Sequence, residues 1–133
     1  MQVVIFKIGD EQFAVETSKV QSINDTMEIT KVPKAPKYIK GLINLRGNII
    51  SLLDINLLLD IEKKNLEQTN IIILEVDEEQ VGMTVDEVDE VLEVEESIIE
   101  RIETERKKSY IKGILNFQDR IVTLIDINKL ISN

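Results

Sequence analysis

The sequence contains no cysteine, no histidine and no tryptophan. Without cysteine, the chain can form no disulfide and no thiolate metal site. Without histidine, it has no imidazole ligand and none of the catalytic triads that need an imidazole base. The remaining reactive groups are carboxylates, lysine, serine, threonine and tyrosine. Carboxylates alone can bind calcium, but the acidic run 86–90 lacks the ligand spacing and the central glycine of a calcium loop, so we expect no metal site and no cofactor.

Excess positive charge and long hydrophobic runs are also missing. The 133 residues include 16 basic and 25 acidic side chains, a formal net charge of −9. Nucleic-acid-binding proteins carry a basic footprint, and anionic membranes repel acidic proteins, so both partners are disfavoured. The longest apolar run, 49–55, is interrupted by Ser51 and Asp54 and is shorter than the roughly 18 residues of a membrane span. With no signal-peptide pattern at its start, the chain is expected to be cytoplasmic, without membrane insertion.

Alanine is scarce, whereas β-branched residues are abundant. The chain has 2 alanines but 22 isoleucines and 12 valines. Isoleucine and valine favour strands, and a sequence poor in alanine forms weak helices. With 43% hydrophobic and 31% charged residues, the composition is that of a globular domain. We expect a mostly β fold.

An internal repeat organises the chain. Residues 38–58 read YIKGLINLRGNIISLLDINLL and residues 110–130 read YIKGILNFQDRIVTLIDINKL, with 11 of 21 positions identical. A shorter echo upstream aligns Val20 with Val88. Two copies of one unit, about 1–66 and 67–133, therefore make up the chain.

Each unit opens with a predicted β-hairpin. The strands are 3–8 with 12–15 in the first copy and 71–76 with 80–85 in the second. After this hairpin, Val20 and Ile23, like Val88 and Val91, have a helix-like spacing of three. That spacing predicts a bend or a short helical turn.

The repeated segment predicts a second hairpin in each unit. In the first copy, strands 41–45 and 48–53 flank a tip where Gly47 or Asn48 can adopt positive φ. Each return strand ends in Asp-Ile-Asn, so Asp54 and Asp126 should cap short helices. The expected helices are 55–59 and 127–131. Short strands with frequent turns favour two small barrels.

Two segments connect these elements. Pro33 and Pro36 predict an extended conformation for residues 31–37, because proline disfavours helix at its own and the preceding position. A polar connector, 60–70, joins the two units.

No motif indicates an active site. The chain has neither a glycine-rich phosphate loop nor a serine elbow. A carboxylate pair of the glycoside hydrolase kind remains a remote alternative among 25 acidic residues. Sugar-binding clefts need aromatic platforms, however, and the few aromatic residues other than Phe13 are expected to pack in the core, Tyr38 and Tyr110 among them.

Charge is distributed unevenly. Residues 75–105 hold 14 acids and one base, whereas residues 29–53 hold no acid. The bases in the second stretch are Lys31, Lys34, Lys37, Lys40 and Arg46. Such a dipole is either an ordinary solvated face or a surface that steers a charged partner.

The repeat provides an internal control on the hairpin tip. Asn44 recurs as Asn116, which indicates a structural hydrogen bond to the backbone near the turn. Arg46 recurs as Gln118, so the fold does not require arginine there. Arg46 is either an ordinary exposed turn residue or a binding residue, since arginine pairs well with carboxylates.

The sequence resembles the CheW family of chemotaxis coupling proteins over residues 3–131. The segments that carry the resemblance are GDEQFAVETSKVQSI, IKGLINLRGNIISLLDI, QVGMTVDEVDEVL and YIKGILNFQDRIVTLIDINKL. The resemblance implies one CheW-like domain over residues 1–133, built from two SH3-like five-stranded barrels around a shared core. It also implies that the N-terminal strand pairs with the second barrel and that the protein has no enzymatic activity.

The resemblance further implies an adaptor that joins the cytoplasmic tips of chemoreceptors to the regulatory domain of the histidine kinase CheA, in membrane-associated arrays. It places a receptor groove between the barrels. The residues that it assigns there are Val20, Ser22, Ile23, Asn44, Arg46, Gly47, Val85, Asp86 and Val88. At Ser22 the family commonly has glutamate, so this chain lacks one charge of the groove.

No local motif assigns the kinase contact. Two alternatives within the family remain: a fragment of the regulatory domain of a CheA kinase, and a coupling protein fused to a receiver domain. The positions at which the chain begins and ends favour a stand-alone coupling protein.

Overall fold

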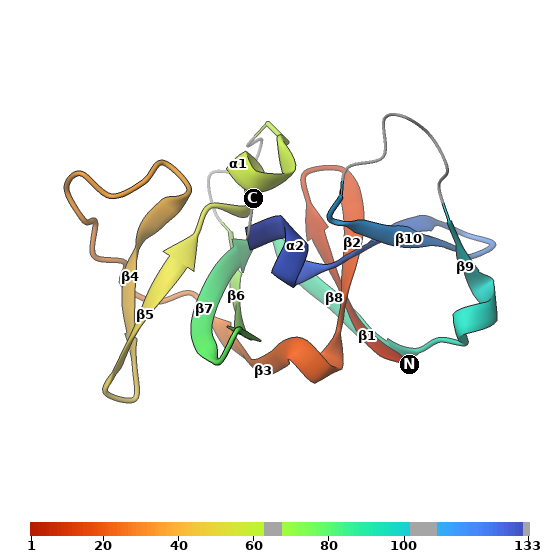
Figure 1. Ribbon diagram of the computed structural model, residues 1–133, viewed down its shortest axis with the longest axis horizontal. Helices are drawn as coiled ribbons and strands as arrows, with labels where there is room; N and C mark the ends of the chain where they lie inside the picture. The colour runs from red at the N-terminus through yellow and green to blue at the C-terminus, as the bar shows by residue number, and fades with distance from the viewer. Residues whose placement is uncertain (63–67, 102–108, 132–133) are drawn as a thin grey trace.

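The computed structural model describes residues 1–62, 68–101 and 109–131. These residues form one sheet of six strands, one sheet of five strands and short helices, which confirms the mostly β fold. Figure 1 shows the two sheets side by side along the long axis, with α2 (Ile127–Ile131) between them.

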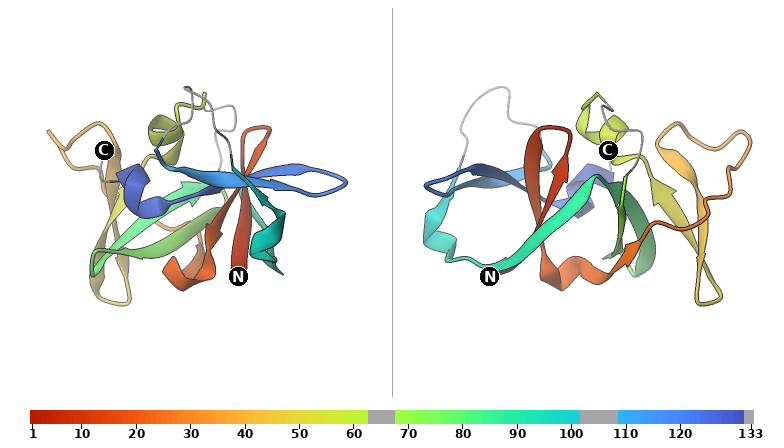
Figure 2. Two further views of the ribbon diagram at one scale, coloured as in Figure 1. Left: turned by 45° about the vertical axis from the view of Figure 1, so that its right-hand side comes forward. Right: turned by 180° about the vertical axis from the view of Figure 1, so that it is seen from behind.

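The six-stranded sheet has the order β8-β1-β2-β11-β10-β9. Its strands are β1 (Gln2–Ile8), β2 (Glu11–Glu16), β8 (Glu87–Glu93), β9 (Ile99–Glu100), β10 (Ile111–Asn116) and β11 (Ile121–Ile125). Strands β2 and β11 run parallel, and the other neighbours are antiparallel. Seen from behind in Figure 2, β8 lies along β1. The first hairpin of the chain is thus paired on both sides with strands from the second half.

The five-stranded sheet has the order β3-β6-β7-β5-β4. Its strands are β3 (Val20–Asp25), β4 (Ile39–Leu45), β5 (Asn48–Leu53), β6 (Asn70–Val76) and β7 (Glu79–Val85). Here the β6–β7 hairpin of the second half lies between β3 and β5 of the first half. Each half therefore contributes its first hairpin to the sheet of the other, and the two halves of the chain cannot separate without loss of strand pairing.

The largest hydrophobic cluster draws on both sheets and on α1 (Ile55–Leu59) and α2. Its large buried members include Phe6, Phe13, Ile55, Ile72, Leu74, Met83, Ile127 and Leu130. Two smaller clusters belong to one sheet each. Because burial of apolar area is the main favourable term in folding, this central cluster is what holds the two sheets together.

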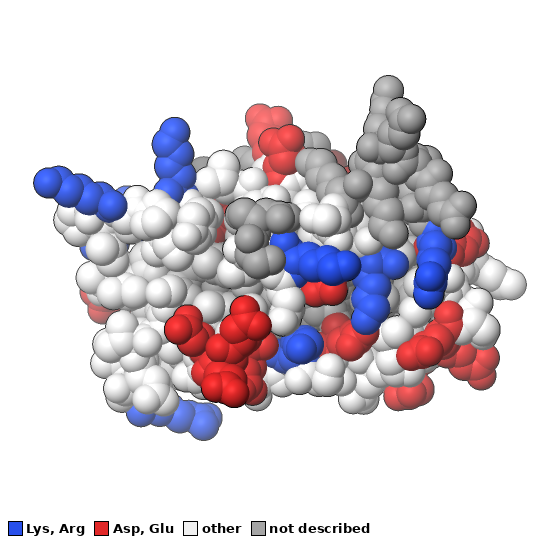
Figure 3. Space-filling model, in the orientation of Figure 1, with Lys and Arg blue, Asp and Glu red and all other residues white. Residues whose placement is uncertain are grey.

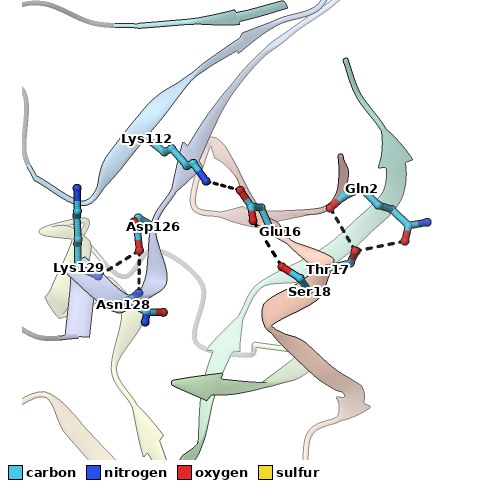
Figure 4. Close-up of polar contacts among 8 residues, drawn as sticks. All are labelled: Gln2, Glu16, Thr17, Ser18, Lys112, Asp126, Asn128 and Lys129. Carbon is cyan, nitrogen blue, oxygen red and sulfur yellow. Dashed lines mark hydrogen bonds and ion pairs between the residues drawn. The ribbon is translucent and has the colours of Figure 1, made fainter. Parts of the chain in front are cut away.

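Both helices begin where the sequence predicts them. The Asp54 carboxylate accepts a hydrogen bond of 3.2 Å from the Leu57 N–H. The Asp126 carboxylate accepts bonds of 3.1 and 3.3 Å from the N–H groups of Asn128 and Lys129, as Figure 4 shows. The predicted N-caps are confirmed. Within the described residues, no helix is long and apolar enough to cross a membrane.

We expect Asp126→Ala to lower the free energy of unfolding by about 1 kcal/mol, because it leaves two N–H groups of the first turn without their cap. Asp126→Asn keeps an acceptor oxygen and should change stability by less than half as much. Urea denaturation of the two variants measures the difference. Equal stability of Asp126→Ala and the parent would contradict a capping role.

The bend or helical turn predicted around Val20 and Val88 lies next to these residues and not at them. A 3-10 turn, Thr17–Lys19, ends directly before Val20, and a bend at Asp86 precedes β8, but Val20 to Ile23 and Val88 to Val91 are strand. A β-bulge explains the spacing. The strand pairing skips Gln21 in β3 and Asp89 in β8, so three sequence positions span only two pairing steps.

The extended conformation predicted for residues 31–37 is also wrong. The segment folds into turns, closed by hydrogen bonds from Ala35 N–H to Val32 O and from Ile39 N–H to Pro36 O. Lys34 has φ of 64°. Proline presets the first central position of such a turn, so Pro33 favours the turn as strongly as it disfavours a helix.

Candidate interaction site

The tip of the β4–β5 hairpin is a two-residue turn. Leu45 pairs with Asn48, and the residues between them, Arg46 and Gly47, have φ of 54° and 86°. Two successive positive φ values match the right-handed twist of the flanking strands. The positive φ thus falls on Arg46 and Gly47, and not on Asn48. The Asn44 side chain accepts a 3.0 Å bond from the Gly47 N–H, which confirms its predicted structural role.

The second copy of this hairpin turns differently. The Phe117 N–H donates a 2.9 Å bond to the Arg120 carbonyl, and Gln118 and Asp119 have no positive φ. Within the described part of the chain, Asn116 makes no bond like that of Asn44, so the predicted role is confirmed for Asn44 and wrong for Asn116. The repeated sequence therefore tolerates two turn types, and only the first holds a side chain in the left-handed region.

Arg46 lies in this unusual backbone conformation, yet no ion pair of its side chain within the described residues compensates for it. A non-glycine residue in the left-handed region costs on the order of 1 kcal/mol. The side chain is exposed and makes no ion pair with any residue that the structure describes. The turn presents the guanidinium to solvent, where a carboxylate of a partner can reach it.

The β3 and β8 residues of the expected groove differ in exposure. Val20 and Val88 are half-buried against the central cluster, whereas Ile23 is 40% exposed. The Ser22 hydroxyl accepts a 2.9 Å bond from the Asn24 side chain. An apolar surface for a partner is thus available at Ile23 and the outer parts of Val20 and Val88.

Val85 and Asp86 lie inside the protein. Val85 is fully buried in the central cluster. The Asp86 carboxylate, 8% exposed, accepts bonds from the Gly9 N–H at 2.7 Å and the Gln68 amide at 3.1 Å. Gln68 also donates to Asn56 of α1. Asp86 therefore joins the β1–β2 turn to the connector and α1, and its carboxylate faces the protein interior.

The structure divides the nine expected residues into two sets. Val20, Val85 and Val88 meet at the central cluster, with Ser22, Ile23 and Asp86 beside them in the chain. Asn44, Arg46 and Gly47 form a separate hairpin tip. Strands β3 and β4 are opposite edges of the five-stranded sheet, and Figure 1 shows the β4–β5 tip apart from β3 and β8. A partner that contacts both sets must reach from β3 and β8 to the β4–β5 tip.

Two other contacts were not expected from the sequence. Arg120 lies 5.5 Å from the Phe117 ring centroid, donates to Asp89 at 2.9 Å and pairs with Glu90. Lys112 of β10 pairs with Glu16 of β2, as Figure 4 shows. The sequence could have indicated the Arg120 ion pairs, because the equivalent position of the first copy is Asn48, which cannot form them.

Among the described residues, no group of three or more acidic side chains is placed to hold a metal ion. The arrangement instead offers a partner exposed apolar side chains, a projecting arginine and a scaffold in which the two halves of the chain are interlocked. These are the features of a binding module.

Comparison with known proteins agrees with this interpretation. The model of the CheW-like domain matches residues 2–133. A probable chemotaxis protein CheW of Rhizobium etli is 30% identical over 135 residues, covering 98% of this chain and 87% of that protein. The chemotaxis protein CheW of Bacillus subtilis is 30% identical over 134 residues, covering 98% and 86%. The crystal structure of the scaffolding protein TtCheW from Thermoanaerobacter tengcongensis superimposes with a TM-score of 0.87 at 30% identity, covering 97% of this chain and 86% of that one.

The fold and these matches define a non-enzymatic scaffolding protein of bacterial chemotaxis. The chain belongs to the CheW family. Its partners are components of chemotaxis signalling, and the hydrolase considered as a remote alternative is excluded.

Proposed function

We propose that the protein couples the cytoplasmic tips of chemoreceptors to the regulatory domain of the histidine kinase CheA, within arrays at the cytoplasmic side of the membrane. The receptor contacts the β4–β5 tip, with Asn44, Arg46 and Gly47, and the surface formed by Val20, Ser22, Ile23 and Val88. Val85 and Asp86 support this surface from beneath. A receptor helix fits such a site by laying apolar side chains on the valines and Ile23 and a carboxylate on Arg46.

The observation that carries this proposal is the conformation of Arg46. Arg46 lies in the left-handed region at an energetic cost, whereas the second copy closes the equivalent hairpin with no arginine and no positive φ at Gln118 or Asp119. We therefore attribute this backbone strain to a contact that the exposed arginine makes with a partner protein.

Arg46→Glu tests the proposal. Reversing the charge replaces attraction to a receptor carboxylate with repulsion, so affinity for a receptor cytoplasmic fragment should fall about tenfold or more. Affinity for the isolated regulatory domain of the kinase should not change. Titration calorimetry with each partner measures both.

Lys129→Glu is the matched control, because it reverses an exposed charge on α2 at a position that is none of the proposed site residues. It should leave both affinities at the parental value. Receptor binding that is undiminished in Arg46→Glu, or diminished equally in Lys129→Glu, refutes the assignment of Arg46.

A further inference from the structure

A second surface lies at the other end of the β4–β5 hairpin from Arg46. It consists of residues 31–37, Tyr38 and Leu57, and we refer to it as the loop-31 surface. In Figure 1 the loop enters β4 at the end opposite the β4–β5 turn. None of its residues belongs to the receptor site proposed above.

The loop-31 surface is strongly basic. Lys31, Lys34 and Lys37 are all exposed, and none of them forms an ion pair with a residue in the described ranges. No acidic residue occurs in the sequence from 29 to 53. Figure 3 shows basic side chains projecting at this end of the molecule, whereas acidic ones gather near the β6–β7 turn. The local field is positive although the protein is acidic overall.

One of these lysines has an unfavourable backbone conformation. Lys34, with φ of 64°, occupies a turn position at which glycine is favoured. A lysine in the left-handed region makes the fold less stable than a glycine would, by on the order of 1 kcal/mol. No hydrogen bond or ion pair of the Lys34 side chain within the described residues compensates for it, so the fold alone gives no reason for lysine here.

Tyr38, which directly follows Lys37 in the chain, and Leu57 of α1 add exposed apolar side chains to this surface. Tyr38 is 42% and Leu57 51% exposed. Asp54 links them, because its N–H donates to the Tyr38 carbonyl at 2.8 Å and its carboxylate accepts from the Leu57 N–H. The core position expected for Tyr38 is therefore wrong.

The repeat again serves as a control. Tyr110, the counterpart of Tyr38, is 9% exposed and belongs to the central cluster, and Lys129 stands where the first copy has Leu57. The shared fold therefore requires neither an exposed tyrosine nor an exposed leucine at these positions. Apolar and basic side chains coincide at this surface in the first copy only.

We infer that the loop-31 surface docks an acidic segment of a partner protein. Carboxylates of the segment face Lys31, Lys34 and Lys37, and an aromatic or aliphatic side chain packs on Tyr38 and Leu57. The net charge of −9 selects against membranes and nucleic acids, since these extended polyanions meet the whole protein field. A short acidic segment meets only the local basic patch.

The test measures binding of a fluorescent synthetic peptide of three Glu-Glu-Leu-Phe repeats to the full chain, by fluorescence anisotropy. Lys34→Gly should weaken binding about threefold, the value expected for one exposed charge pair, while the free energy of unfolding stays equal or rises. The triple variant Lys31→Gln, Lys34→Gly, Lys37→Gln should weaken binding about tenfold or more. Tyr38→Ser should weaken it about threefold or more, because it removes the aromatic contact.

Lys129→Gln, which removes one exposed positive charge from α2, is the control and should bind like the parent. Vesicles of phosphatidylserine and phosphatidylcholine form a second arm. The inference is overturned if the peptide does not bind at millimolar concentration, if the triple variant binds it like the parent, or if vesicles bind and the peptide does not. The stability of Lys34→Gly separates loss of a contact from loss of the fold.

Discussion

Gly41→Ala is expected to destabilise the protein by about 2–3 kcal/mol, the upper part of the range of about 1–3 kcal/mol that is typical when atoms are forced into a packed site. A Cβ at Gly41 would lie 2.6 Å from the carbonyl oxygen of Thr30 and 2.6 Å from Ile29 Cγ2. Thr30 and Leu42 exchange two backbone hydrogen bonds, so the obstructing oxygen cannot move away cheaply. Urea denaturation measures the loss.

Gly47→Ala is the matched control. Gly47 has positive φ but no atom within 4 Å of the Cβ position, so the same substitution should cost only about 1 kcal/mol of backbone strain. Gly113 is the equivalent of Gly41 in the second copy and allows the same test. A Cβ at Gly113 would lie 2.4 Å from Ile99 Cγ2 and 3.1 Å from the Glu100 carbonyl oxygen. If Gly41→Ala costs no more than Gly47→Ala, the close approach of the two backbones is not what excludes a side chain.

Asp86→Ala is expected to lower the free energy of unfolding by about 3 kcal/mol, since a buried donor left without its acceptor costs about 1–3 kcal/mol. The substitution leaves both the Gly9 N–H and the Gln68 amide without the carboxylate that they share. Because these bonds join the β1–β2 turn to the connector, hydrogen exchange at Gly9 should also accelerate.

Asp119→Ala provides the control for Asp86→Ala, because Asp119 is an exposed turn residue and its loss changes the net charge equally. It should alter stability by less than about 0.5 kcal/mol. If Asp86→Ala folds as stably as Asp119→Ala but binds receptor fragments more weakly, the Asp86 carboxylate acts on the partner and not within the chain.

Local features were predictable from the sequence. The hairpins, the Asn44 bond and the caps at Asp54 and Asp126 depend on interactions between residues a few positions apart, and all are confirmed. Comparison of the two copies also singled out Arg46 as a residue that one copy adds, although positive φ was expected at Gly47 or Asn48 and not at Arg46.

Features that depend on distant contacts were not predictable. The spacing between Val20 and Ile23 imitated a helix because a bulge against β6 inserts one residue into β3. Tyr38 and Tyr110 occupy equivalent sequence positions, yet only Tyr110 meets the central cluster. Val85 and Asp86 were expected at a groove but lie inside, since the end of β7 faces the joint core.

The amino-acid sequence alone determined that two related units of short strands and capped helices make up this protein, because turn residues, caps and β-branched runs act over a few positions. Only the tertiary structure decided that each unit lends its first hairpin to the other's sheet, and so which side chains are inside and which face a partner. That choice rests on a cluster that brings together residues more than 60 positions apart, such as Phe6 and Leu74, and no local pattern encodes it.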